Sequence, residues 1–180
     1  DSGTSFSAPF VAGVAAVLLQ QNPNLTPADV KAILQNSTTP ARTLNTSSAP
    51  FYPLSLQGVG RVQVDKSLQL SALASPGGLS FGVLNPAQKQ FEARTLTLKN
   101  FSHKHRYFKV TVEAGQKNRG VELRVPREVH IAPNSVKELT IRLVADPRKL
   151  TNDINANSLI EADGWIVFSD EDDTLRVGYA

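Results

Sequence analysis

The chain has 180 residues, of which 41% are hydrophobic and 19% charged, so it is long enough for two modest domains and too apolar to be disordered. It contains no cysteine, which excludes disulfides and thiolate metal sites. Its net charge of +3, from 19 Lys or Arg against 16 Asp or Glu, is far below that of a nucleic-acid-binding arm.

The first predicted element is an apolar helix over residues 6–20. No charged residue occurs from position 2 to position 28, and apolar side chains lie all around the helical wheel, so the helix needs cover on every side. Pro9 and Gly13 lie inside it, it is short for a membrane span, and no charged segment precedes it as in a signal peptide. We therefore predict a core helix, no membrane span, and a longer polypeptide whose N-terminal part is missing.

A second helix is predicted to begin at Thr26 and to run to about Asn36. Thr26 supplies an N-cap, Pro27 suits the first turn, and Asp29 lies at the positive end of the helix. A loop over residues 37–57 and a short extended piece over residues 58–64 should follow. Asp65 is then predicted to cap a last helix that ends near residue 73.

After residues 72–78, which are rich in Ser, Gly and Pro, the hydrophobic period changes to two. The pattern predicts about seven antiparallel strands, over or near residues 79–83, 93–99, 108–112, 121–125, 139–143, 165–169 and 175–179. Such a count is typical of an immunoglobulin-like β-sandwich. We therefore predict an α+β chain with a helical part over residues 1–74 and a β-sandwich over residues 75–180.

Four consecutive acidic residues, 170–173, separate the last two predicted strands. We interpret them as the tip of a hairpin, where acidic side chains keep an edge soluble and tolerate a turn. A calcium site at this tip is the weaker alternative.

Ser5 stands where a glycine turn leads into the apolar helix. Serine is a poor nucleophile at neutral pH, so a hydrolase must add a base, expose the hydroxyl and stabilise the oxyanion. Gly3 permits a sharp turn, and the unpaired N–H groups of a first helical turn can polarise an acyl oxygen. These residues indicate a catalytic serine, whereas a shorter Gly-Thr-Ser sequence alone is usually only an N-cap.

The full sequence of this region is Gly3-Thr4-Ser5-Phe6-Ser7-Ala8-Pro9, followed by Val11-Ala12-Gly13. It resembles the serine signature of the subtilisin-like proteases, the subtilases. The resemblance implies that Ser5 is the nucleophile, that its own backbone N–H contributes to the oxyanion hole, and that the neighbouring motif residues support it, namely Gly3, Thr4, Ser7, Ala8 and Pro9. Residues 25–34 and 58–64 extend the resemblance to about residue 73.

The family resemblance implies a serine endopeptidase that acts on protein or peptide substrates and is secreted or held at the cell surface. Residues 1–74 would be the C-terminal piece of its α/β catalytic domain, and residues 75–180 are similar to the fibronectin-type-III-like domain of larger subtilases. The family's Asp and His precede its serine, as in subtilisin itself, so they and the oxyanion Asn should lie upstream. We expect no cofactor in this part, structural calcium only in the missing part, and no peptide hydrolysis by the fragment alone.

Other interpretations of the same residues stay open. His103 and His105 could hold a metal, although alternating residues on a basic strand usually face solvent. Eight Lys or Arg between residues 99 and 127 could bind nucleic acid or an anionic cell-wall polymer, but the small net charge argues against nucleic acid.

At the level of function, the alternative is a binding or scaffolding module that acts through the sandwich and carries a vestigial serine motif. Because the apolar helix lacks a sheet to cover it, we also expect self-association or an altered helix position.

Overall fold

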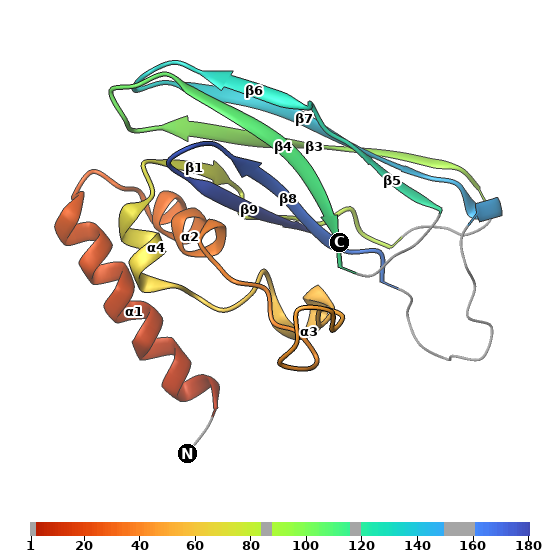
Figure 1. Cartoon of the computed structure of the whole chain (residues 1–180), viewed down its shortest axis with the longest axis horizontal. Helices are drawn as coiled ribbons and strands as arrows, with labels where there is room; N and C mark the ends of the chain where they lie inside the picture. Colours follow the sequence, from red (N-terminus) through yellow and green to blue (C-terminus); the bar gives the residue numbers. More distant parts are fainter. Residues whose placement is uncertain (1–2, 84–87, 116–119, 150–160) are drawn as a thin grey trace.

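The computed structural model describes residues 3–83, 88–115, 120–149 and 161–180, and it combines a helical layer with two β-sheets (Figure 1). The α-helices of the described residues are Thr4–Gln21 (α1), Pro27–Asn36 (α2), Leu54–Gln57 (α3) and Val64–Gln69 (α4). The strands are Ala72–Ser75 (β1), Gly78–Leu79 (β2), Gln90–Asn100 (β3), Arg106–Ala114 (β4), Val121–Arg124 (β5), Glu128–Ile131 (β6), Val136–Ala145 (β7), Gly164–Ser169 (β8) and Thr174–Tyr179 (β9). A 3-10 turn, Pro147–Lys149, follows β7. The predicted mixture of helix and sheet is confirmed.

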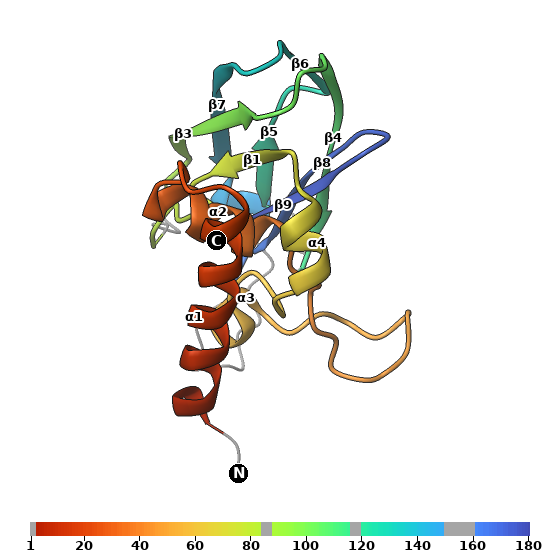
Figure 2. The same cartoon turned by 90° about the vertical axis from the view of Figure 1, so that its left-hand side faces the viewer.

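The helix α1 forms where its apolar pattern predicts it, and it projects away from the sheets (Figures 1 and 2). Only Val14 and Leu18 are buried in it. Phe6 and Phe10, in its N-terminal half, remain 59% and 57% exposed. The cover that such a helix requires is therefore absent over this half, among the residues that the structure describes.

The start of α2 follows the sequence signals closely. The Thr26 side chain accepts a hydrogen bond from the Asp29 backbone N–H, and the Asp29 carboxylate accepts one from the Thr26 N–H, which completes a capping box. The buried residues of α2 include Val30, Ile33 and Leu34. The predicted second helix is thus confirmed in both its ends and its buried face.

The last helix differs from its prediction at both ends. Gln63 occupies the N-cap position of α4, and Asp65 lies inside its first turn, so Asp65 is not the cap. The helix ends at Gln69, and β1 follows, where helix was expected. Backbone pairing explains this difference, since β1 runs antiparallel to residues 97–100 of β3. This long-range pairing is invisible in the local pattern. The strand also crosses the predicted boundary between residues 74 and 75, which stays a prediction.

The strands form two sheets, one of order β1-β3-β7-β5 and one of order β2-β9-β8-β4-β6. All pairs are antiparallel except β2 with β9, which is parallel. The sequence pattern predicted neither β1 nor β6 as strands. Both are only four residues long, as is β5, which was predicted.

One hydrophobic core lies between the two sheets. Leu96 and Ile141 reach it from the first sheet, and Phe108, Phe168 and Val177 reach it from the second. All five are buried, as alternate inward-facing residues of packed sheets should be. The arrangement is compatible with the predicted sandwich. A smaller second core lies between the helices and combines Val14 and Leu18 of α1 with α2, Leu73 of β1 and Phe101.

Candidate functional site

Ser5 lies in the first turn of α1, where the sequence predicted it. Gly3 is the N-cap residue, with φ 154° and ψ 165°, a backbone conformation that side chains disfavour. Its carbonyl oxygen accepts from the N–H groups of Phe6 at 3.1 Å and Ser7 at 3.4 Å. Glycine at this position therefore lets the chain turn directly into the helix.

The hydroxyl of Ser5 is presented to solvent. Ser5 is exposed, no side chain caps this helix end, and the Ser5 hydroxyl has no hydrogen-bond partner in the described part of the chain. The backbone N–H groups of Thr4 and Ser5 likewise have no described partner. A free hydroxyl thus lies beside two free donors at the electropositive end of a helix, which is an arrangement that can hold an oxyanion.

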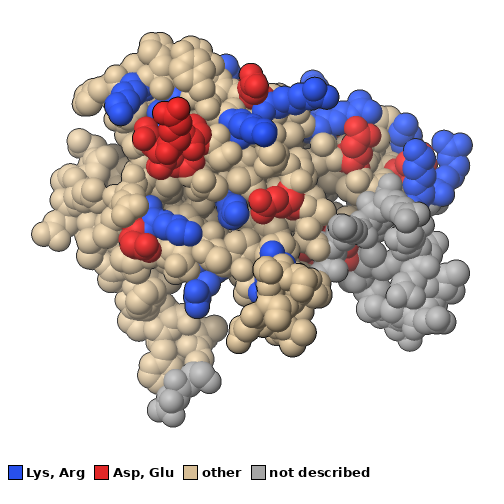
Figure 3. Space-filling view, viewed as in Figure 1, with Lys and Arg blue, Asp and Glu red and all other residues tan. Residues whose placement is uncertain are grey.

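The residues predicted to support Ser5 are exposed together with it. Gly3 caps α1, and Thr4, Ser7, Ala8 and Pro9 lie in its projecting half. A Cβ atom added at Gly13 would meet nothing within 4 Å. In Figure 3 the described residues of this projecting end show no charged side chain. The close packing expected around these small residues is therefore not formed within the described chain.

A groove beside the C-terminal half of α1 is lined mostly by apolar side chains. It has a volume of about 610 Å³ and runs between α1, α2 and the segment before α4; its walls include Val11, Ala15, Leu19, Val30, Leu34 and Val59. Lys31 is the charged residue of its lining. Ser5 does not line this groove, so the groove and the serine are separate features.

The three histidines do not approach Ser5. His105 and His130 lie at the edge formed by β4 and β6, on the opposite side of the molecule from the N-terminus (Figures 1 and 2). The His105 Nδ1 and the His130 Nε2 are 3.0 Å apart, and the Tyr107 ring stacks on His130 with centroids 4.3 Å apart. His103 contacts Asn134. All three histidines are exposed, and none is a base for Ser5 in this structure.

The histidines form no metal centre either. Among the described residues, no three His, Cys, Asp or Glu side chains gather as potential metal ligands. No local pattern indicates the contact between His105 and His130, because the two residues are 25 positions apart and meet only where β4 pairs with β6.

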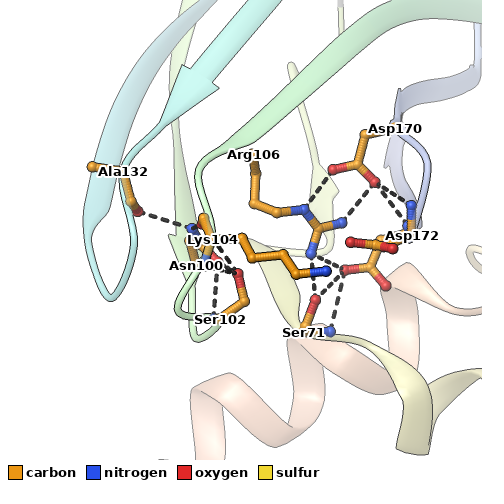
Figure 4. Close-up of polar contacts among 9 residues, drawn as sticks. Ser71, Asn100, Ser102, Lys104, Arg106, Ala132, Asp170 and Asp172 are labelled. Atoms are coloured by element: carbon orange, nitrogen blue, oxygen red, sulfur yellow. Dashed lines mark hydrogen bonds and ion pairs between the residues drawn. The ribbon is translucent and has the colours of Figure 1, made fainter.

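The predicted hairpin between β8 and β9 is confirmed, but the role predicted for its acidic residues is wrong for two of the four. Asp170 and Asp173 do not keep an edge soluble; they are buried and bind the buried guanidinium of Arg106 (Figure 4). The Arg106 Nε and Nη2 each lie 2.6 Å from an Asp170 oxygen, and the Arg106 Nη1 lies 2.9 Å from Asp173. The Ser71 hydroxyl accepts from Arg106 and donates to Asp173. Arg106 was missed because it lies 64 positions before Asp170.

Within this cluster the pKa of the acid and the pKa of the arginine are shifted in opposite directions. Burial acts to raise the pKa of Asp170, but hydrogen bonds from Arg106 and from two backbone N–H groups outweigh it, so the pKa is lowered. Burial acts to lower the pKa of Arg106, and the two carboxylates overcome it, so the pKa is raised. Both groups are therefore held in their charged forms, and the cluster is a structural ion pair.

Three of the basic residues between positions 99 and 127 are paired with acids. Lys99 pairs with Asp29 at 3.0 Å, Arg106 is buried in the cluster above, and Arg124 pairs with Glu122 in solvent. Lys117 and Arg119 lie outside the described residues.

The helix α1 also has the length and composition of a membrane span, with a mean hydropathy of 1.2 over its 18 residues. A single helix of this kind near an N-terminus is weak evidence, because the core helix of a soluble protein has the same character. The predicted absence of a membrane span stays a prediction.

Solved structures resemble the chain only loosely. A FixG-related protein from Vibrio parahaemolyticus is 20% identical with a TM-score of 0.36, over 53% of this chain and 94% of that one. WR4, a C. elegans MSP family member, is 14% identical with a TM-score of 0.35, over 61% of this chain and 94% of that one. Scores this low decide nothing about fold or function. The fibronectin-type-III-like assignment stays a prediction.

Sequence comparison is more informative for the N-terminal part. The minor extracellular protease Vpr of Bacillus subtilis is 27% identical over 148 residues, which are 82% of this chain and 18% of the relative. The serine protease AprX of Bacillus subtilis is 60% identical over 37 residues, which are 21% of this chain and 8% of the relative. The chain thus spans less than a fifth of either relative. Residues 1–60 match the subtilase family, Peptidase S8, and together with these relatives the match supports a subtilisin-like serine protease family for the N-terminal third of the chain.

Proposed function

We propose that this chain supplies the nucleophile of a subtilisin-like serine endopeptidase. In the proposed reaction the Ser5 Oγ attacks the scissile carbonyl carbon and its proton passes to a histidine. The histidine then gives this proton to the amine as the C–N bond breaks, which leaves an acyl-enzyme on Ser5. Water then attacks the acyl-enzyme and releases the new carboxylate. The observation that carries the proposal is the exposed Ser5 hydroxyl at an uncapped helix N-terminus, inside the region that matches the subtilase family.

The proton acceptor must come from outside this chain. The three histidines of this chain are exposed: His130 lies on β6, and His103 and His105 lie in the loop before β4, away from the start of α1 (Figure 1). The family resemblance assigns the base and its orienting Asp to an N-terminal catalytic part. We therefore propose that the longer polypeptide is active and that this chain alone is not, because in subtilisin itself loss of the base costs on the order of a millionfold in turnover.

The substrates of the proposed enzyme are proteins or peptides, and no cofactor is needed for acyl transfer by serine. Secretion is proposed because one of the relatives bears the name of an extracellular protease. The same helix end that displays the hydroxyl offers the N–H of Ser5 to the oxyanion, so one short segment would supply both nucleophile and donor.

A fluorophosphonate probe tests this proposal directly. In a polypeptide that includes the N-terminal catalytic part, the probe should label Ser5, and the Ser5→Ala variant should lose the label. Ser48→Ala is the matched control, because Ser48 is an exposed serine in a loop remote from the motif. Equal labelling of the parent and of Ser5→Ala would remove Ser5 from the mechanism. Absence of labelling in all of them would favour a vestigial motif on a binding module.

A further inference from the structure

Asn36, the last residue of α2, is fully buried, with 0% of its surface exposed. Its Nδ2 donates to the Arg176 carbonyl oxygen of β9 at 2.9 Å, and its Oδ1 accepts from the Ala74 N–H of β1 at 2.7 Å. A carbonyl can only accept and an N–H can only donate, so these partners fix the orientation of the amide. Both backbone groups would be left unpaired without it.

The two partners of Asn36 belong to different sheets. The strand β1 is the edge of the first sheet, whereas β9 lies in the second. One side chain of the helical layer therefore joins both sheets, and α2 lies against β1 and β9 where it does so (Figure 1). The Asn36-Ser37-Thr38 sequence has the pattern of a glycosylation sequon, but the Asn36 nitrogen is buried and engaged.

Neighbouring contacts fix the rest of α2. Ser37, next to Asn36, shares a buried hydrogen bond of 2.7 Å with Ser67 of α4. At the opposite end of the helix, Asp29 binds Lys99 of β3 at 3.0 Å. The Trp165 indole of β8 donates to the Val59 carbonyl in the loop before α4. The helical layer is thus bound to the sheets at several points besides Asn36.

The connection continues from α2 to the serine-bearing helix. Val14 and Leu18 of α1 share the second core with Val30 and Ile33 of α2 and with Leu73 of β1. The C-terminal half of α1 therefore packs against α2 through Val14 and Leu18, and α2 packs against the two sheets. Asn36 does not touch Ser5; any effect on Ser5 passes through this packing.

We infer that Asn36 is a positioning residue that seats α2, and through α2 the helix bearing Ser5, on the two-sheet half of the molecule. The two sheets then support the helical layer and do not move relative to it as a separate binding module would. The relevance of Asn36 to Ser5 rests on the proposed function, whereas its role in holding α2 on the sheets does not.

Amide hydrogen exchange on this chain tests whether Asn36 holds α2 on the sheets, and it requires no enzymatic activity. Asn36→Ala leaves two buried backbone groups unpaired, so amide exchange should rise by about 30-fold or more in α2 and also in β1 and β9. Asn45→Ala, which removes an asparagine from an exposed loop, should change none of these rates. A rise confined to α2, with β1 and β9 unchanged, would overturn the inference.

A pH profile separates hydrogen bonding from mere packing. In Asn36→Asp a protonated carboxyl can still donate to Arg176 and accept from Ala74, whereas the ionised form faces a carbonyl and must be buried as a charge. The pKa of the introduced Asp should therefore rise on folding. Its stabilising contribution would be present below the unfolded pKa and lost as pH rises through the folded one. The melting temperature of Asn36→Asp should thus approach that of the parent in acid and fall behind at neutral pH. A constant difference would overturn the bridging role.

The last experiment measures the effect of Asn36 on Ser5 in the longer polypeptide. Asn36→Ala should slow fluorophosphonate labelling of Ser5, and Asn45→Ala should not. If exchange rises in α2, β1 and β9 of Asn36→Ala while the probe labels Ser5 in none of the proteins, the proposed function fails. In that case the role of Asn36 in holding α2 on the sheets is retained. If labelling of Ser5 is normal in Asn36→Ala, the positioning role is overturned while the proposed function stands.

Discussion

The helix α1 and the turn between β8 and β9 distribute polarity in opposite ways. The helix carries no charged side chain, yet Phe6 and Phe10 in its N-terminal half face solvent. The turn holds four consecutive acids, yet Asp170 and Asp173 are buried, with 9% and 3% of their side chains exposed. What differs is the partner: Arg106 meets the acids, and nothing in the described chain meets the start of the helix. Burial follows from the available partner and not from the polarity of the segment alone.

Removing the arginine should give the largest effect. Arg106→Met leaves two buried carboxylates without a cation, so the free energy of unfolding should fall by about 3 to 5 kcal/mol. Urea denaturation of parent and variant measures this change. A loss below about 1 kcal/mol would mean that the acids are solvated after all, since exposed ion pairs contribute no more than this.

Neighbouring leucines of α1 test how much of this helix is packed. Leu18 is 3% exposed and belongs to the second core, whereas Leu19 is 41% exposed. Leu18→Ala should reduce the free energy of unfolding by about 2 to 4 kcal/mol because it opens a cavity. Leu19→Ala, its matched control, should cost less than about 1 kcal/mol. Equal losses in thermal or urea unfolding would contradict the different burial of these two leucines.

Asp29 allows a smaller test with a defined pH dependence. Burial acts to raise its pKa, but hydrogen bonds from Lys99 and Thr26 outweigh this, so the pKa lies below the usual 3.8. Its stabilisation is therefore present above 3.8 and lost as pH falls through the lowered value. Asp29→Asn should cost about 1 kcal/mol at neutral pH, through the lost ion pair and helix-end charge.

Melting temperatures measured from neutral pH into acid provide the check on Asp29. The gap between parent and Asp29→Asn should close in acid. Lys31→Gln, an exposed change on the same helix, should show no gap at any pH. A gap that widened in acid would contradict the assigned sign.

The exposed pair Arg124 and Glu122 should give the smallest effect. Its nitrogen and oxygen lie 3.3 Å apart, with 60% and 65% of the two side chains exposed. Arg124→Gln should change the free energy of unfolding by less than about 1 kcal/mol in urea titrations. It is also the matched control for Arg106→Met, because both remove an arginine from an ion pair and only one of these pairs is buried. If Arg124→Gln lowered the free energy of unfolding as much as Arg106→Met, burial would not explain the difference expected between the two ion pairs.

Local signals predicted the elements that local signals govern. The capping residues around Thr26 fixed the start of α2, and the alternation around Phe108 and Ile141 identified strands of the two sheets. The strand β1 was missed because its pairing with β3 is long-range. The position of Ser5 at the start of α1 was also predictable, since it needs only a glycine turn and an apolar helix. Its role as nucleophile stays a proposal.

Sequence by itself determined where the chain turns, which faces are apolar and which serine stands at a helix N-terminus, because each depends on residues within about two helical turns of one another. Only the tertiary structure decided that Arg106 meets Asp170 and Asp173, that Asn36 joins β1 to β9, and that half of α1 stays uncovered. These outcomes depend on contacts between residues far apart in the chain, whose pairing is set by how the layers pack and not by any local pattern.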